Sequence, residues 1–122
     1  MGISNPITKF RLDYLRPLPL VVDFEWSDVA GGSVSMGLCR AGHLINKTTV
    51  EIIEAFNGGT EITIGDSVAQ GRLQAVADNV PEEVSHYEVV NNYGYVSETT
   101  IFLFFPNGTP TVGKGRAIVY FD

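Results

Sequence analysis

Residues 48–66, TTVEIIEAFNGGTEITIGD, place apolar and polar side chains in an order that fits two kinds of element. At helical spacing Val50, Ile53 and Phe56 fall on one side, which is typical of a short amphipathic helix. At period two, apolar and polar side chains mix on both faces of a strand. The stretch is crowded with threonine, valine and isoleucine, whose branched side chains lose rotamer freedom in a helix but pack well on a sheet. We therefore predict a strand.

The residues that follow indicate a turn. Asn57-Gly58-Gly59 tolerates positive φ angles, and residues 61–64 alternate between polar and apolar before Gly65-Asp66. The two runs on either side of this turn are predicted to form a hairpin.

The remaining pattern is also strand-like. Short apolar or alternating runs separated by Gly, Pro and Asn occur at residues 18–24, 34–36, 86–90, 94–96, 98–105 and 116–121. Residues 67–85 are predicted to form a long connection with at most a short helical turn, because Gly71 and Pro81 interrupt it. About seven or eight such strands describe an antiparallel sandwich or barrel, and we predict an all-β sandwich of jelly-roll or immunoglobulin-like type.

The prediction divides the chain into two parts. Residues 18–122 form the sandwich domain, and residues 1–17 form an extended N-terminal arm, since Pro6 and Pro17 disfavour a continued helix.

The run TTIFLFF, residues 99–105, has apolar side chains on both faces. Ile101 and Leu103 share one face, and Phe102 and Phe104 share the other. Leaving both phenylalanines in water would forfeit several kcal/mol, at roughly 1.5 to 3 for each large side chain. We expect their face to be covered by the arm, by residues 67–85 or by another subunit.

Charge is distributed unevenly along the chain, whose formal net charge is −6. Residues 1–16 carry Lys9, Arg11 and Arg16 against Asp13, whereas residues 17–122 hold five basic and thirteen acidic side chains. An acidic body without a basic stripe argues against nucleic-acid binding. The basic arm suits an acidic neighbour, although a solvated tail explains it equally well.

Residues that carry chemistry are sparse. Cys39 is the one cysteine, which excludes an intrachain disulfide and a cysteine-based zinc site. No apolar run approaches the roughly 20 residues of a membrane span, and no secretion signal opens the chain. Neither Ser33 nor Ser35 has the spacing of a nucleophile elbow, and His43 and His86 make no metal signature. We predict no enzymatic activity, no metal and no cofactor.

Two sets of side chains leave alternatives open. The acidic residues Asp66, Asp78, Glu82 and Glu83 lack the spacing of a calcium loop and are interpreted as solvated surface. The aromatic residues could form a flat platform for a sugar, although core or subunit packing explains them as well; they are Trp26, Tyr87, Tyr93 and Tyr95.

The order of strands and turns resembles that of small β-sandwich virion proteins of tailed bacteriophages. The matching features are a strand ending in Ala-Phe, one ending in Gly-Asp, an Arg-Leu pair, a connection ending in Asp, and a glycine turn before a final Val-Tyr. Here they are Ala55-Phe56, Gly65-Asp66, Arg72-Leu73, Ala77-Asp78, Gly113 to Gly115 and Val119-Tyr120. The resemblance covers residues 43–122.

The resemblance implies a structural protein of a phage particle, made in the host cytoplasm and carried on the capsid surface of the virion. A decoration or cement protein fits best: commonly a homotrimer, it would bind the major capsid protein or another virion protein and stabilise the assembled head. Lys9, Arg11 and Arg16 would then contact the capsid, and Phe102 and Phe104 would lie at a covered face. The alternative is a carbohydrate- or receptor-binding module of a tail or fibre that uses Trp26, Tyr93 and Tyr95, with no membrane involved in either case.

Overall fold

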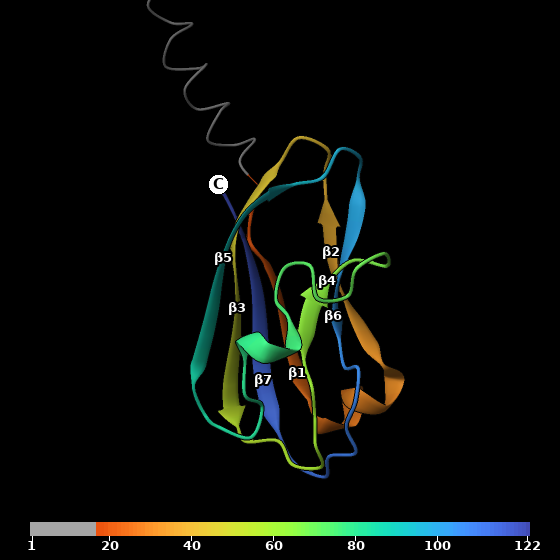
Figure 1. Cartoon of the computed structure of the whole chain (residues 1–122), viewed down its shortest axis with the longest axis vertical. Helices are drawn as coiled ribbons and strands as arrows, with labels where there is room; N and C mark the ends of the chain where they lie inside the picture. Colours follow the sequence, from red (N-terminus) through yellow and green to blue (C-terminus); the bar gives the residue numbers. More distant parts are fainter. Residues whose placement is uncertain (1–16) are drawn as a thin grey trace, which may run out of the picture.

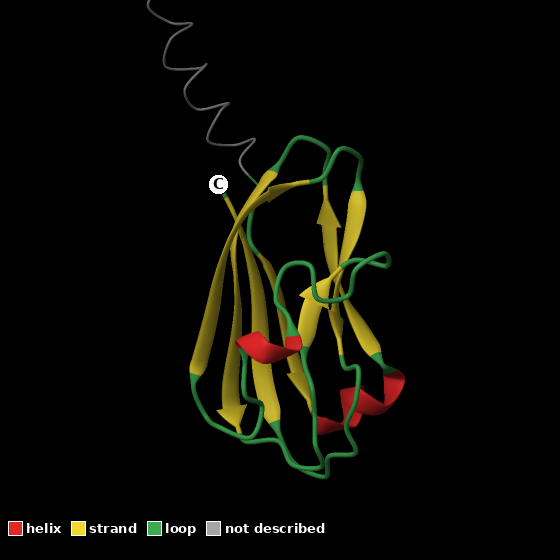
Figure 2. Cartoon of the chain, in the orientation of Figure 1, coloured by secondary structure: helices red, strands yellow, loops and turns green. Residues whose placement is uncertain are grey.

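The computed structural model of the chain describes residues 17–122 and shows two antiparallel sheets packed face to face (Figure 1). The four-stranded sheet has the order β1-β7-β3-β5, formed by Leu20–Glu25, Lys114–Phe121, Leu44–Glu54 and His86–Gly94. The three-stranded sheet has the order β2-β6-β4, formed by Ser33–Cys39, Thr99–Phe104 and Thr63–Gly65. Two short 3₁₀ helices, η1 (Trp26–Gly31) and η2 (Val76–Asp78), complete the described part (Figure 2). The predicted all-β sandwich is confirmed.

Residues 48–54, whose pattern fitted either a helix or a strand, lie in β3 as predicted. β3 lies between β5 and β7, so it is hydrogen-bonded on both sides. Val50 and Ile52 point into the core and are 0% and 1% exposed. Glu51 and Ile53 alternate with them on the outer face, which explains why apolar and polar residues mix in this stretch.

The predicted hairpin between this strand and residues 61–64 is wrong. β4 pairs with β6 in the other sheet, so residues 55–62 carry the chain across the sandwich. Phe56 and Ile62, at the two ends of this crossing, are both buried in the core. Gly58 and Gly59 adopt φ angles of 71° and 67°, as a hairpin turn would also require. The same turn residues therefore fit either a hairpin or a crossing between sheets. The burial of Phe56 and Ile62 favours the crossing.

The prediction of two separate strands at residues 86–90 and 94–96, with Asn91 and Asn92 between them, is also wrong. β5 runs without interruption to Gly94, and Asn92 has a φ of 50° inside it. The pairing register with β3 shifts by one residue between Ile45 and Lys47. Asparagine tolerates this left-handed conformation, so here it allows an irregularity in a continuous strand instead of ending it.

Residues 66–85 close the edge of the sandwich between β4 and β5, with the predicted helical turn formed by η2. A buried polar network fixes this connection to both sheets. The backbone carbonyl of Leu73 accepts hydrogen bonds from Thr48 Oγ1 and Asn91 Nδ2, at 2.9 and 2.7 Å. Asn79 Nδ2 donates to the carbonyl of Ile62 and to Gln74 Oε1, at 3.0 and 2.8 Å. Because these polar groups are buried and hydrogen-bonded, they hold residues 66–85 in a fixed position against the sandwich.

Within residues 17–122, no helix has the length and apolar character needed to cross a membrane. The basic residues of the predicted arm, Lys9, Arg11 and Arg16, lie outside the described residues.

Candidate functional site

The outer face of the three-stranded sheet carries a ridge of two phenylalanines. Phe102 and Phe104 point away from the core, are half-buried, and lie with their ring centroids 5.4 Å apart. Their partners on β2 are Ser35 and Ser33, both exposed. The sequences of β2, β4 and β6 contain no Asp, Glu, Lys or Arg. We call this surface, formed by the outward residues of β2 and β6, the Phe102–Phe104 face: it is uncharged, its two rings lie beside small hydroxyl side chains, and it also includes the exposed Leu38.

The outer face of the four-stranded sheet differs in carrying ion pairs, which lie among exposed apolar residues such as Val21, Ile53 and Val90. Arg116 Nε donates to Asp23 Oδ1 at 2.7 Å, and Lys47 Nζ lies 2.9 Å from Glu88 Oε1. The hydrogen bond from Arg116 lowers the pKa of Asp23, and the bond to Glu88 raises the pKa of Lys47. These exposed pairs form a solvated, charged surface whose net contribution to folding is small.

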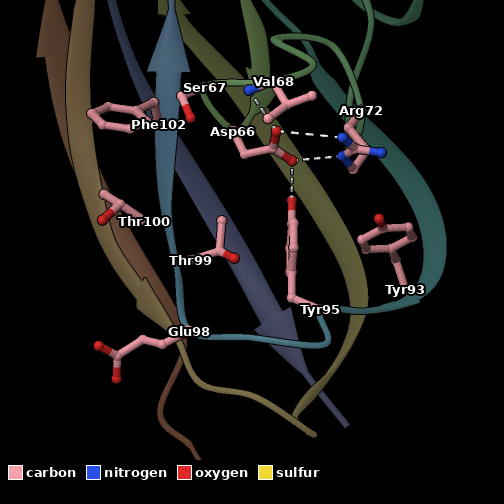
Figure 3. A pocket seen from close by; sticks show the side chains of 10 residues that line it. All are labelled: Asp66, Ser67, Val68, Arg72, Tyr93, Tyr95, Glu98, Thr99, Thr100 and Phe102. Atoms are coloured by element: carbon pink, nitrogen blue, oxygen red, sulfur yellow. Dashed lines mark hydrogen bonds and ion pairs between the residues drawn. The ribbon is translucent and has the colours of Figure 1, made fainter.

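A groove of about 520 Å³ opens beside β6, where its neighbour β4 stops (Figure 3). β4 pairs with β6 only from Phe102 to Phe104, so the part of β6 that begins at Thr99 has no strand on that side among the described residues. Tyr95, from the loop after β5, forms the opposite wall. We call this cavity the β6 groove; among its lining residues are Asp66, Val68, Arg72, Tyr95, Thr100 and Phe102.

The inner end of the groove is fixed by Asp66, whose side chain is 3% exposed. Its carboxylate accepts Arg72 Nε at 2.6 Å and the Tyr95 hydroxyl at 2.7 Å. The backbone amides of Val68 and Ala69 also donate to it, each at 2.9 Å. Burial by itself would raise the pKa of Asp66, but these donors outweigh it and lower the pKa to about 2. The carboxylate is therefore ionised and fully bonded, which suits it to holding the turn closed rather than to exchanging a proton.

Tyr95 is held in the same cluster. Burial and its hydrogen bond to Asp66 raise the pKa of the hydroxyl well above its ordinary value, so it is neutral. Its ring meets that of Tyr93 edge-on with centroids 4.9 Å apart, and the Arg72 guanidinium lies 5.4 Å from the Tyr93 ring centroid. The cluster is a rigid wall for the groove.

The structure brings together only part of the predicted aromatic platform. Tyr93 and Tyr95 meet at the groove, beside the loop that leads into β6. Trp26 belongs to η1 and lines a different cavity with Thr109 and Pro110, in the loop after β6. Since these two loops lie at opposite ends of β6, Trp26 cannot share a surface with the tyrosines.

The remaining candidates for chemistry are dispersed. Ser33 begins β2, and His43 follows its far end, packing edge-on against Phe121. His86 Nδ1 lies 3.9 Å from Glu51 on the outer face of the four-stranded sheet. Over residues 17–122, no group of three His, Cys, Asp or Glu side chains could hold a metal ion.

Sequence reasoning missed the Asp66 cluster, which it interpreted as solvated surface. One local signal was present, because an aspartate that follows a strand commonly bonds the amides two and three residues onward, as Asp66 does here. Its bond to Tyr95 joins residues 29 positions apart and has no signal in the sequence.

No protein-family model matches the chain, and no curated protein matches it either. Among solved structures, its fold is similar to that of a chain in the cyanophage Pam1 capsid asymmetric unit, with a TM-score of 0.64 and 14% sequence identity. The match covers 84% of this chain and 80% of that chain, so the two are of similar length. At this identity the likeness establishes a shared sandwich fold over most of both chains.

Proposed function

We propose that this protein is a virion structural protein of a tailed phage, of the decoration or cement type, which binds the assembled head and stabilises it. The observation that carries the proposal is the match to a chain of a cyanophage capsid unit over most of both chains. The dispersed serines and histidines and the fully bonded Asp66 also favour adhesion over catalysis.

The Phe102–Phe104 face is the proposed contact surface. A half-buried aromatic ridge on an uncharged sheet can be covered without desolvating any ion, whereas covering the opposite face would desolvate the Asp23–Arg116 and Lys47–Glu88 pairs. Aromatic residues that lie at the centre of an interface commonly supply most of its binding free energy. The proposed partner is the protein shell of the assembled head. We also propose that the protein associates with itself as a trimer.

The basic residues Lys9, Arg11 and Arg16 are the proposed second contact, because opposite charges steer a basic segment onto an acidic neighbour. Stabilisation follows from mass action: a protein that binds only the assembled shell adds its binding free energy to that state.

The direct test is co-sedimentation of the purified protein with shells of the phage that encodes it, before and after those shells are stripped of accessory proteins. We expect saturable binding to stripped shells, and shells that survive higher temperature once they are loaded. Absence of binding to stripped shells would refute the shell-binding role.

A matched pair of variants separates the arm from general charge effects. The triple change Lys9→Gln, Arg11→Gln and Arg16→Gln should weaken shell binding, while Lys47→Gln, Lys114→Gln and Arg116→Gln removes the same charge from the outer face of the four-stranded sheet and should not. Equal binding by both triple variants would exclude the arm as an anchor.

The alternative role, a carbohydrate- or receptor-binding module of a tail or fibre, has one supporting observation, the Tyr93–Tyr95 pair on the wall of the β6 groove. Two observations weigh against it: the Tyr95 hydroxyl is already bonded to Asp66, and Trp26 lies at the other end of the sandwich. Glycan binding that is lost in Tyr93→Ala would favour this role over the shell.

A further inference from the structure

The β6 groove has the position of a missing strand segment. Ile64 directs its backbone N–H and C=O to Gln74, away from β6, so Thr63 and Gly65 direct theirs toward Phe104 and Phe102. By the same alternation, Thr100 must direct its N–H and C=O past the end of β4, into the groove. The chain turns away at Asp66, held there by Arg72 and Tyr95, and no other segment of residues 17–122 pairs with this stretch of β6 on that side.

The groove offers what an added strand requires. The backbone groups of Thr100 provide one donor and one acceptor at an open sheet edge, the feature through which extended peptides join a sheet. Figure 3 shows Phe102 and Thr100 pointing to one side of β6, with Thr99 and Tyr95 on the other side beneath Asp66. Alternate side chains of an incoming strand would therefore meet Phe102 on the outer side and the Tyr95 ring on the inner side.

The chain itself contains a segment with the matching pattern outside the described residues. In KFRLDY, residues 9–14, the apolar Phe10, Leu12 and Tyr14 alternate with the charged Lys9, Arg11 and Asp13. This period of two is typical of a strand with one apolar face. Residues 9–16 carry three basic side chains and one acidic one, whereas residues 17–122 carry five basic and thirteen acidic side chains. Electrostatic attraction therefore favours contact between residues 9–16 and the sandwich.

A second copy is better placed to donate this segment than the same chain. Leu20 begins β1 and contacts Gly37 of β2, which places it at the β1/β2 edge of the sandwich. The groove lies at the opposite edge, between β6 and Tyr95, and the straight path between the two edges runs through the core. The position beside Thr100 is about 10 Å from Gly37 along the sheet, two strand spacings. The six residue steps from Tyr14 to Leu20 span at most about 20 Å and would have to include a detour around β2 and over its outer side chains.

We propose that residues 9–14 of one copy dock as an extended strand in the β6 groove of a neighbouring copy, beside Thr100. The contact is head-to-tail, the kind that closes into a ring when the rotation between copies allows it. Lys9 and Arg11 would then face outward beside the Phe102–Phe104 face, where they remain free to contact an acidic shell. The inference concerns contacts between copies and does not depend on shell binding.

Disulfide trapping between two full-length variants tests this proposal without any shell. Leu12→Cys is placed in one chain and Ser67→Cys, an exposed residue at the groove, in a second chain of different mass; the native Cys39 is buried. After mixing and mild oxidation, mass spectrometry measures the cross-linked heterodimer. The matched control pairs Leu12→Cys with Ser27→Cys, an exposed serine in η1 at the far end of the sandwich.

We expect the Ser67 pair to give at least about tenfold more heterodimer than the Ser27 pair, because docking raises the effective concentration of the two thiols. An excess of a synthetic peptide of residues 5–16 should suppress the product, while a scrambled peptide of equal composition should not. Equal yields for the two pairs would overturn the proposal. The proposal would also be overturned if a double variant, Leu12→Cys with Ser67→Cys, formed the disulfide within one chain while the mixed single variants formed no cross-linked heterodimer. Since these assays contain no shell, either failure leaves the shell-binding result to be judged separately.

Discussion

The two outer faces of the sandwich use the same strand geometry for opposite purposes. On the four-stranded sheet, Asp23, Arg116 and Glu51 lie side by side on β1, β7 and β3, and alternate in charge. On the three-stranded sheet, the corresponding positions of β2 and β6 hold Ser33, Ser35, Phe102 and Phe104, with no charged residue in any of its strands.

The difference lies in the ion pairs, because the four-stranded sheet also exposes the apolar side chains of Val21, Ile53 and Val90 on its outer face. A charged ladder keeps an exposed sheet soluble and discourages other chains from covering it, because its ions would lose their hydration. A charge-free face with two phenylalanines has no such barrier. The contrast predicts that substitutions on the two faces affect association and stability in different ways.

The largest expected effect is on shell binding. Phe104→Asp should weaken binding about 100-fold or more, because an unpaired carboxylate in a closed interface costs several kcal/mol. Val90→Asp places the same charge on the outer face of β5, at a residue that is 69% exposed, and should bind as the natural protein does. Co-sedimentation of both variants at several concentrations measures this difference. Equal loss in both would show that the two faces do not differ as docking surfaces.

The next effect separates a buried ion pair from an exposed one. Asp66→Asn should lower the free energy of unfolding by about 2 kcal/mol, since it weakens the bonds from Arg72 and Tyr95 to a buried carboxylate. Asp23→Asn makes the same change in the exposed pair with Arg116 and should leave the urea midpoint unchanged. Urea unfolding followed by tyrosine and tryptophan fluorescence measures both. Similar midpoints for the two variants would contradict the structural role assigned to Asp66.

The same carboxylate predicts a pH dependence. The pKa of Asp66 is lowered from its ordinary 3.8 to about 2 in the folded state. Its contribution to stability is therefore complete above the unfolded-state value and is lost as the pH falls through about 2. The difference in unfolding free energy between the natural protein and Asp66→Asn should be constant from pH 7 to pH 5 and shrink between pH 4 and pH 2. A difference that stays constant down to pH 2 would show that Asp66 is not the titrating group.

A smaller effect reports whether residues 1–16 cover the Phe102–Phe104 face within one chain. Phe104→Ser should cost about 1 to 2 kcal/mol in the isolated protein, because the described residues bury the ring only in part. Leu103→Ala, on the inner face of the same strand at 0% exposure, should cost about 2 to 5 kcal/mol. Comparable losses in the two urea titrations would mean that another part of the chain buries the ridge before any partner does.

The smallest effect concerns the charged ladder itself. Glu88→Gln removes the partner of Lys47 on the outer face of the four-stranded sheet. We expect no measurable change in the urea midpoint at physiological salt, because exposed ion pairs are screened and contribute little. A clear loss of stability would show that the ladder is structural rather than only solvating.

The strands were largely predictable, because period-two alternation has local causes. Which face of each strand points inward was not, since both faces of residues 48–55 mix apolar and polar residues and both faces of residues 99–105 are apolar; Val50, Ile52, Ile101 and Leu103 are the buried ones. The apolar character of both faces of residues 99–105 predicted a covered second face, and the described residues leave Phe102 and Phe104 partly exposed there. Pairing partners were less predictable, since the turn at Asn57-Gly58-Gly59 fits a hairpin as well as a crossing between sheets.

The sequence by itself determined the all-β class, the location of most strands, and the unequal charge of the first sixteen residues and the rest. Each of these properties depends on neighbours in the chain, through alternation or local composition. The tertiary structure alone decided that β3 and β4 belong to different sheets, that Asp66 meets Tyr95, and that no strand within residues 17–122 pairs with β6 on the β4 side at Thr100. Those features arise from contacts between distant residues, where many pairings satisfy the local pattern and only the packing of the whole core selects one.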